Sequence, residues 1–271
     1  MKEEQLKSKY EKLQLLIKKL KKVIVAFSGG VDSSFLAKIS FDVLGVNATA
    51  ITIAAPQLSD DEIIEAQKIA KDIGIKHFII PSELVNTDWF ETNPEDRCYI
   101  CKKGNIELIA KYCQENNIEG QVIEGSNFDD LDDYRPGFQA VKEYSVLSPL
   151  VDVKLTKDNI RKLSKQLQLD CWDKPASPCL ATRFPFGEKI TVEKLKMVSQ
   201  SEDYLKTFGI IDLRVRVHGD VARIETDTKY FDVLFKNSIQ ITEQLKNYGF
   251  SFVTIDLEGY KKGSMNKTMK K

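Results

Sequence analysis

Two cysteines stand three positions apart in the segment DRCYICKK, and a third follows in a proline-rich segment. Cys98 and Cys101 open a stretch with helical spacing, where positions i and i+3 share a face, so both thiolates can point to one ion. Cys179 adds a third thiolate, which still leaves a structural zinc site one ligand short. His77 and His218 do not stand at zinc-like spacing. The trio suits a cubane iron–sulfur cluster with one open iron, or a set of exchanging thiols; the alternative is three small buried residues.

A glycine-rich turn lies between an apolar run and a helical stretch near residue 30. The run VIVAF (residues 23–27) leads into SGGVDSS, and a helix is expected from Ser33 to about Leu44. Glycines let the backbone approach a ligand, and a helix N-terminus offers N–H groups to phosphate. The turn matches neither GxxxxGKS/T nor GxGxxG, which argues against a lysine-bearing P-loop and a dinucleotide oxidoreductase. The sequence predicts a phosphate site; the alternative is a plain turn.

A second polar loop follows the apolar run QVIEG. The segment EGSNFDDLDDYRPG (residues 124–137) gathers four carboxylates, Asp129, Asp130, Asp132 and Asp133. Ligands of parallel α/β sheets sit beyond the carboxyl ends of the strands, and carboxylates there can hold Mg²⁺. The alternative is a solvated acidic loop.

The segment LRVRVHGDVARIE reads as a β-hairpin with a two-residue Gly-Asp turn. This register places Arg216 opposite Arg223 and Arg214 opposite Glu225, on the face that the apolar residues leave free. Like charges directly opposite each other destabilise a sheet, and arginine is well shaped to bind phosphate between them. We predict that this face binds the phosphate of a substrate, with Arg183 as a further anion clamp. The alternative is an exposed basic face.

Three acidic residues of the C-terminal part give one more candidate site, and the two remaining cysteines give none. Glu225 together with Glu202 or Asp232 can supply carboxylates for a metal ion. Cys113 and Cys171 are better explained as small core residues.

Strand-like and helix-like stretches alternate through the first two thirds of the chain. Apolar runs are expected to form strands at 23–27, 48–55, 77–81 and 121–125, and helical spacing occurs at 33–44, 60–73, 101–116 and 156–167. Ser59 and Glu62 have the capping-box spacing at the start of the second helix. The alternation predicts an α/β fold with a doubly wound, mostly parallel sheet. An amphipathic helix is expected before the first strand.

The pattern changes near residue 185. Prolines at 175, 178 and 185 exclude both a helix and a central strand there. Beyond them, a helix at 191–208, strands at 213–217, 221–225 and 252–257, and two further helical stretches describe a small α+β unit. The sequence therefore predicts two domains, 1–184 and 185–271.

The charges balance, with 40 Lys+Arg against 40 Asp+Glu in 271 residues. No global attraction draws such a chain to nucleic acid or to an anionic membrane, so neither is expected as a partner. The charged N-terminal segment lacks the apolar core of a signal peptide or a spanning helix. We expect a cytoplasmic protein with reduced cysteines that holds an anionic ligand in a local site.

SGGVDSS resembles the signature of the PP-loop ATP pyrophosphatase superfamily. DRCYICKK, EGSNFDDLDDYRPG and DKPASPCLATRFPFG together resemble the LarE family, whose members build the nickel-pincer nucleotide, and the likeness spans residues 21–266. The resemblance implies an adenine nucleotide alpha hydrolase-like fold. It implies an enzyme that splits ATP between the α- and β-phosphates, adenylylates a carboxylate of pyridinium-3,5-biscarboxylic acid mononucleotide and converts it to a thiocarboxylate. The residues implied to hold the pyrophosphate portion of ATP and Mg²⁺ are Ser28, Gly29, Gly30, Asp32 and Ser33, joined by Asn127 and Asp129.

The same resemblance bears on the sulfur source. Some LarE members give up the sulfur of one linker cysteine, and others carry three cysteines with a [4Fe-4S] cluster. Cys98, Cys101 and Cys179 match the second kind, and a sacrificial role for Cys179 stays open. A small nucleotide substrate, a sulfide donor and a homo-oligomer are the expected partners. The alternatives are a tRNA 2-thiolation enzyme and an ammonia-using, amidotransferase-type ligase.

Overall fold

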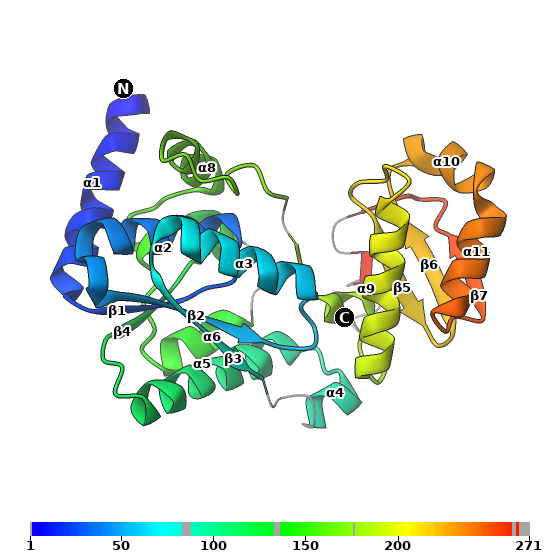
Figure 1. The fold of residues 1–271 in the computed structure, drawn as a ribbon, viewed down its shortest axis with the longest axis horizontal. Coiled ribbons are helices and arrows are strands. Elements are labelled where there is room, and N and C mark those ends of the chain that lie inside the picture. Colours follow the sequence, from blue (N-terminus) through cyan, green and yellow to red (C-terminus); the bar gives the residue numbers. More distant parts are fainter. Residues whose placement is uncertain (1, 83–87, 133–135, 176, 262–263, 266–271) are drawn as a thin grey trace. The chain divides into compact units, whose positions relative to one another are not determined.

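Short apolar runs form a four-stranded parallel sheet, shown in Figure 1. The strand order is β3 (Lys76–Pro81), β2 (Ala48–Ala54), β1 (Val23–Ala26) and β4 (Gln121–Glu124). At the carboxyl end of β1, Ala26 pairs with Ile51 on one side and with Glu124 on the other. The predicted α/β fold with a parallel sheet is confirmed, and loops that follow β1 and β4 start side by side.

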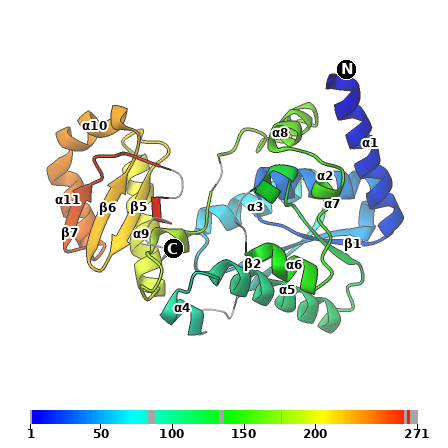
Figure 2. The same ribbon diagram turned by 180° about the vertical axis from the view of Figure 1, so that it is seen from behind.

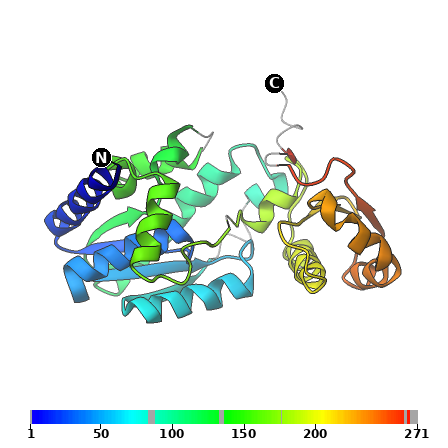
Figure 3. The ribbon, with the colours of Figure 1, turned by 90° about the horizontal axis from the view of Figure 1, so that it is seen from above.

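Helices cover both faces of this sheet. Alternate residues of β1 point to opposite faces: Val23 and Val25 belong to one apolar cluster, and Ile24 belongs to another with Ile109. The helices of the first face, seen from above in Figure 3, are α1 (Lys2–Leu20), α2 (Val31–Leu44), α3 (Asp60–Ile73) and α8 (Lys157–Gln166). The second face carries α5 (Arg97–Glu115) and α6 (Gly137–Glu143). Two further helices are short: α7 (Pro149–Asp152) lies in the same unit, and α4 (Asp88–Thr92) belongs to the second compact unit of the chain.

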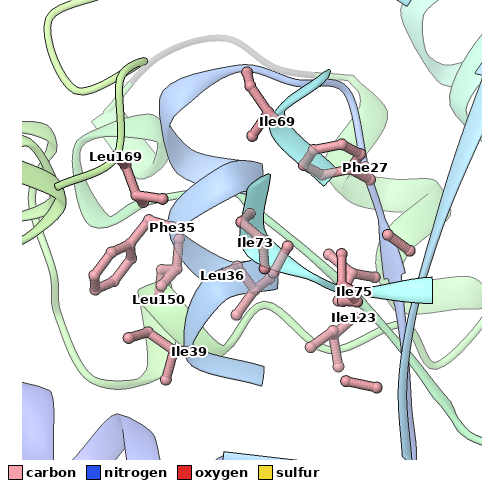
Figure 4. Packing of buried hydrophobic residues seen from close by; sticks show 14 of the residues in the cluster. Phe27, Phe35, Leu36, Ile39, Ile69, Ile73, Ile75, Ile123, Leu150 and Leu169 are labelled. Atoms are coloured by element: carbon pink, nitrogen blue, oxygen red, sulfur yellow. The ribbon is translucent and has the colours of Figure 1, made fainter. Parts of the chain in front are cut away.

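Helix α2, which begins at the glycine turn, is the central helix of the first face. It contacts α1, α3 and α8, and its side chains Phe35, Leu36 and Ile39 are fully buried. Figure 4 shows them among Ile73 of α3 and Leu150. This packing fixes the position of the helix N-terminus that the phosphate-loop prediction requires.

The C-terminal residues form a separate small sheet with order β5 (Arg214–His218), β6 (Val221–Glu225) and β7 (Phe252–Ile255). The predicted hairpin register is confirmed, because Arg216 pairs with Arg223 and Arg214 with Glu225. Strand β7 adds parallel to β6. Figure 2 shows this sheet with its helices α9 (Val192–Lys206), α10 (Phe231–Lys236) and α11 (Ser238–Asn247).

The computed structural model describes residues 2–82, 88–132, 136–175, 177–261 and 264–265. The chain divides into two compact units, one of Met1–Leu84 with Cys98–Ser177, the other of Val85–Arg97 with Pro178–Lys271. The sequence analysis placed the change near residue 185 and did not assign residues 85–97 to the second unit. Within that unit Ile190 N donates to Phe90 O at 2.7 Å, which joins the two segments. None of the helices in the described ranges has the length and apolar character needed to cross a bilayer.

Gly29 is expected to be the least replaceable glycine of the first unit. Its φ is +69°, and a Cβ built there lies 2.9 Å from Ala66 Cβ and 3.0 Å from Ala66 Cα. Gly29→Ala should lower the free energy of unfolding by about 2 kcal/mol or more, because left-handed strain adds to a clash with α3. Urea unfolding measures this. Gly74→Ala is the matched control, since Gly74 also has a positive φ (+84°) but meets only ring carbons of Phe41 at 3.3 Å; an equal loss in both variants would contradict the clash.

Candidate functional site

The phosphate loop is the segment 28–33, and its own hydroxyls brace it. Ser28 N donates to Ser33 Oγ at 3.2 Å, and Ser33 Oγ donates to Gly30 O at 3.1 Å. Gly30 is the N-cap of α2 and brings no side-chain cap. The first N–H groups of α2 therefore face the loop without a competing side chain, which is the arrangement that binds phosphate.

Asp32 has one occupied and one unoccupied carboxylate oxygen. Its Oδ2 accepts from Lys157 Nζ at 2.7 Å and from Asn127 Nδ2 at 3.4 Å. Its Oδ1 is buried and has no hydrogen-bond partner among the described residues. A buried carboxylate oxygen without a partner beside a phosphate loop fits Mg²⁺, which takes oxygen ligands from one or two carboxylates and from phosphates.

The acidic loop lies beside the phosphate loop, where Asn127 Nδ2 donates to Asp32 Oδ2 at 3.4 Å. Asp129 N donates to Asn127 Oδ1 at 3.0 Å, and Asn127 N donates to Asp130 Oδ2 at 2.9 Å. Together with the phosphate loop these three residues line a pocket of about 550 Å³, which we call the loop pocket. The Asp132 side chain and Asp133 lie outside the described residues.

A buried carboxylate lies at the end of β4 in the same pocket. Glu124 accepts from Lys102 Nζ at 3.0 Å, from Ser126 Oγ at 2.8 Å and from Ser148 Oγ at 2.5 Å. Burial raises the pKa of Glu124, but the Lys102 charge and these hydrogen bonds outweigh it, so the pKa lies below its ordinary value. Glu124 is therefore ionised at neutral pH.

The two cysteines of α5 differ in their surroundings. Cys98 is exposed and lines a second pocket of about 300 Å³, which we call the Cys98 pocket. Cys101 is partly buried, and its Sγ accepts from Gln57 Nε2 at 3.5 Å and from Asn105 Nδ2 at 3.8 Å. Amide donors directed at a sulfur suit a thiolate or a metal-bound sulfur.

The other three cysteines occupy different environments. Cys179 belongs to the second unit, where it precedes a short 3₁₀ turn, Leu180–Arg183. Cys113 and Cys171 are buried, as predicted for core residues. Burial raises the pKa of both thiols, which keeps them protonated.

In the β5–β6 hairpin, which we call the arginine hairpin, a carboxylate of the protein itself balances the like charges of Arg216 and Arg223. Glu225 lies between the paired arginines: Arg216 Nε donates to its Oε2 at 2.9 Å, and Arg223 Nη2 donates to its Oε1 at 3.0 Å. Arg223 also donates to Asp256 Oδ2 at 2.9 Å. The anion that the sequence analysis expected between Arg216 and Arg223 is thus a protein carboxylate, and Arg216 is only 5% exposed.

Arg183 is held in a buried, two-pronged ion pair. Its Nε and Nη2 donate to the two carboxylate oxygens of Glu202, each at 2.9 Å. Its Nη1 donates to Pro178 O at 2.7 Å and to Cys179 O at 3.2 Å. These contacts correct the expectation of an open anion clamp, because Arg183 fixes the segment that bears Cys179.

The proposed carboxylate metal site is not assembled. Glu202 and Glu225 bind arginines, and Asp232 lies in the first turn of α10. Over the part of the chain that the structure describes, no three His, Cys, Asp or Glu side chains gather to hold a metal ion.

Arg214 differs from the other hairpin arginines, because it has no ion pair within the described residues. Its guanidinium lies 5.2 Å from the centre of the Tyr260 ring, and its Nη1 donates to Leu213 O at 2.6 Å. Burial, followed by the nearby Arg183 charge, lowers the pKa of Arg214. A half-buried cation of this kind has the most to gain from a bound anion.

Known proteins resemble this chain over most of its length. Residues 5–129 match the NAD synthase family. The chain is 41% identical to an uncharacterized protein of Synechocystis sp., over 98% of this chain and all of that protein. It is 34% identical to the pyridinium-3,5-bisthiocarboxylic acid mononucleotide synthase of Lactiplantibacillus plantarum, over 98% of this chain and 96% of that enzyme.

The chain belongs to the LarE family. The PP-loop fold and the sulfur-transferase role implied by the sequence motifs agree with this membership. A glutamine-hydrolyzing GMP synthase of Lactobacillus gasseri is 29% identical over 69% of this LarE-family chain and 39% of its own length.

Sequence reasoning missed the cations of the loop pocket. Lys102, Lys157 and Lys174 line it, and Lys174 Nζ lies 2.5 Å from Glu65 Oε2. Lys102 could have been found as the residue that follows Cys101 in the LarE-like segment DRCYICKK. Lys157 is the first residue of α8, and only the fold brings it to Asp32.

A half-buried histidine, His77, supports the strand that leads into the phosphate loop. Thr52 Oγ1 donates to Phe27 O at 2.8 Å and lies 2.8 Å from His77 Nε2. The hydroxyl proton is used on Phe27, so Nε2 of His77 carries a proton and donates it to Thr52 Oγ1. Burial lowers the pKa of His77 below its ordinary 6.5.

The stability of this LarE-family chain should therefore fall as the pH drops through 6.5. Its two histidines, His77 and His218, both have pKa values lowered by burial, and Arg223 adds to the effect at His218. Below that pH the unfolded chain binds more protons than the folded one. The free energy of unfolding therefore falls by up to about 1.4 kcal/mol per pH unit for each histidine. Urea unfolding at pH 7.5 and 5.5 measures the loss. The double variant His77→Gln/His218→Gln should lose less, and a loss equal to that of the natural chain would contradict the assignment.

Proposed function

We propose that this chain adenylylates a carboxylate of pyridinium-3,5-biscarboxylic acid mononucleotide with ATP and converts it to a thiocarboxylate, for nickel-pincer nucleotide synthesis. The observation that carries the proposal is the phosphate loop with the unpartnered Asp32 Oδ1, in the same unit as Cys98 and Cys101. The name of the Lactiplantibacillus relative states the bisthiocarboxylic product of such a reaction.

The loop pocket supplies the ATP half of the chemistry. The N–H groups at the start of α2 and the Ser28 hydroxyl bind the β- and γ-phosphates, and Asp32 holds Mg²⁺ beside Asn127 and Asp129. With the phosphates fixed, a carboxylate oxygen attacks the α-phosphorus in line and pyrophosphate leaves. The product is an acyl-adenylate, from which AMP is readily displaced.

The cysteines supply the sulfur half. By their resemblance to the LarE motifs, Cys98, Cys101 and Cys179 are the residues that would hold a [4Fe-4S] cluster, which would supply sulfide; the described residues show no assembled group of three such ligands. The donors Gln57 and Asn105 favour a negatively charged sulfur at Cys101. Loss of one sulfur from Cys179 itself is the other possible source, and the two differ in the mass of the protein after turnover.

The unpaired Arg214 is the residue we assign to the substrate phosphate. Arg216 and Arg223 already share Glu225, so they position the hairpin, whereas Arg214 has no ion pair among the described residues. In the same unit, Arg183 Nη1 donates to the carbonyl oxygen of Cys179 and so holds the segment that bears this cysteine.

Cys98→Ala should separate the two half-reactions. In an anaerobic assay with ATP and the pyridinium mononucleotide, the variant should still release pyrophosphate, because the residues that bind ATP line the loop pocket and Cys98 does not. Formation of thiocarboxylate, measured by mass spectrometry, should be abolished. Continued thiolation would refute the role of Cys98.

The matched control is Cys113→Ala, a change of the same residue type on the same helix. Cys113 is in the core, so both half-reactions should survive its replacement at a temperature where the variant is folded. In the natural protein, thiolated product with protein of unchanged mass indicates delivery through a cluster. Protein lighter by one sulfur indicates sacrifice of a cysteine.

Arg214→Ala should weaken substrate binding far more than ATP binding. Loss of a charge-assisted contact to phosphate costs about 1.5–3 kcal/mol, which corresponds to a KM for the mononucleotide about 10- to 100-fold higher. The KM for ATP should change less than about twofold, since the phosphate loop belongs to the other unit. Lys229→Ala, on an exposed lysine of the same unit, serves as control, and equal changes in both KM values would contradict the assignment.

An ammonia-using ligase is the alternative favoured by the matches to NAD synthase and GMP synthase. It shares the adenylylation step and differs in the nucleophile. The same assay with an ammonium salt in place of sulfide decides the matter, because a ligase forms the amide and a sulfur transferase forms none.

A further inference from the structure

The loop pocket and the Cys98 pocket meet at two residues. Of the residues that line the Cys98 pocket, Lys102 and Ser126 also line the loop pocket. The remaining wall of the Cys98 pocket is largely apolar and includes Pro136, Phe138 and Val141. It is therefore a place for a flat ring next to the site of the phosphates.

The proposed reaction brings two anions together. The attacking carboxylate and the α-phosphate both carry negative charge, and their approach is unfavourable unless a cation lies near both. Such a cation must reach the phosphate loop on one side and the substrate ring on the other. Among the described residues that line the Cys98 pocket, Lys102 is the one cation.

The other two lysines of the loop pocket are held elsewhere. Lys157 Nζ lies 2.7 Å from Asp32, where it faces the start of α2, and Lys174 Nζ is bound to Glu65 of α3. Neither lines the Cys98 pocket. Lys102 is 32% exposed at its side chain and is anchored at one point, the carboxylate of Glu124.

We propose that Lys102 is a catalytic residue of the adenylylation step, where its ammonium group holds the substrate carboxylate in the Cys98 pocket against the α-phosphate of ATP in the loop pocket. This inference rests on the proposed function and adds to it the place of the reacting carboxylate. It puts the acyl group that will receive sulfur in the pocket whose wall carries Cys98.

The Glu124 carboxylate keeps hydrogen-bond partners when the Lys102 ammonium group turns toward the substrate carboxylate and the α-phosphate. Two hydroxyls, from Ser126 and Ser148, still donate to the carboxylate without the lysine. Glu124 therefore keeps two hydrogen-bond donors at the junction of the two pockets.

The step balances without any proton transfer. A lone pair of the carboxylate oxygen forms the new bond to the α-phosphorus, and the bond from the α-phosphorus to the oxygen that bridges to the β-phosphorus breaks. That electron pair leaves with pyrophosphate. Lys102 stays protonated throughout and neutralises the charge that builds up on the α-phosphate oxygens.

Lys102→Met tests the proposal in the full-length protein with ATP and pyridinium-3,5-biscarboxylic acid mononucleotide. Release of pyrophosphate that depends on the mononucleotide should slow by about 100-fold or more, since removal of one charge-stabilising donor typically costs that much. The affinity for ATP alone, measured by equilibrium dialysis, should change less than about threefold. Lys103→Met, the neighbouring lysine outside both pockets, should retain the natural rate.

A second variant separates chemistry from folding, because Lys102→Met leaves the buried Glu124 without its cation. Lys102→Met/Glu124→Gln removes that stranded charge. If Lys102 touches the reacting atoms, the double variant stays as slow as the single one; recovery to within about tenfold of the natural rate would overturn the proposal. An unimpaired Lys102→Met enzyme would overturn it as well. A natural protein that releases no pyrophosphate with this mononucleotide would instead overturn the proposed function.

Discussion

The parallel pairing of β1 with β4 is the constraint on which the site depends. Because Ala26 lies opposite Glu124, the chain leaves both strands at the same edge and level of the sheet. The segment after β4 approaches the start of α2 so closely that a Cβ on Gly125 would lie 2.9 Å from the backbone nitrogen of Ser33. Phosphate loop, acidic loop and buried Glu124 are thus brought together by one pair of strands.

The balanced charges of the sequence are balanced locally as well. In the loop pocket Asp32 lies against Lys157 and Glu124 against Lys102, and in the second unit Glu202 and Glu225 lie against arginines. The two arginine pairs are buried on both sides, and breaking a buried pair costs about 3–5 kcal/mol, so these groups hold one another in fixed positions. A small anion then meets an arranged set of charges.

Local rules predicted most of the fold. Helix α3 begins and ends at the expected residues because Ser59 and Glu62 form both hydrogen bonds of the capping box. The hairpin register followed from a two-residue turn and from alternation of apolar residues. Boundaries elsewhere shifted by a few residues, as at α5, which begins at Arg97 and not near Cys101.

The site was only partly predictable, because side-chain partners depend on tertiary contacts. The phosphate loop is predictable from its glycine turn between a strand and a helix. Asn127 and Asp129 are assigned by resemblance to the LarE motifs, and the structure places both in the wall of the loop pocket. The placing of Glu225 between two arginines did not, since cross-strand register fixes Cα positions and leaves the choice of side-chain rotamer open. Lysines recruited from distant helices, such as Lys157, carry no local signal at all.

The course of the chain between the units has a mechanical consequence for the cysteines. The backbone passes from one unit to the other between Arg97 and Cys98, and again between Ser177 and Pro178, directly before Cys179. Cys98 therefore directly follows one crossing, and Cys179 stands two residues after Ser177, the last residue of the first unit. The backbone of each of these two thiols is covalently tied to both units within two residues.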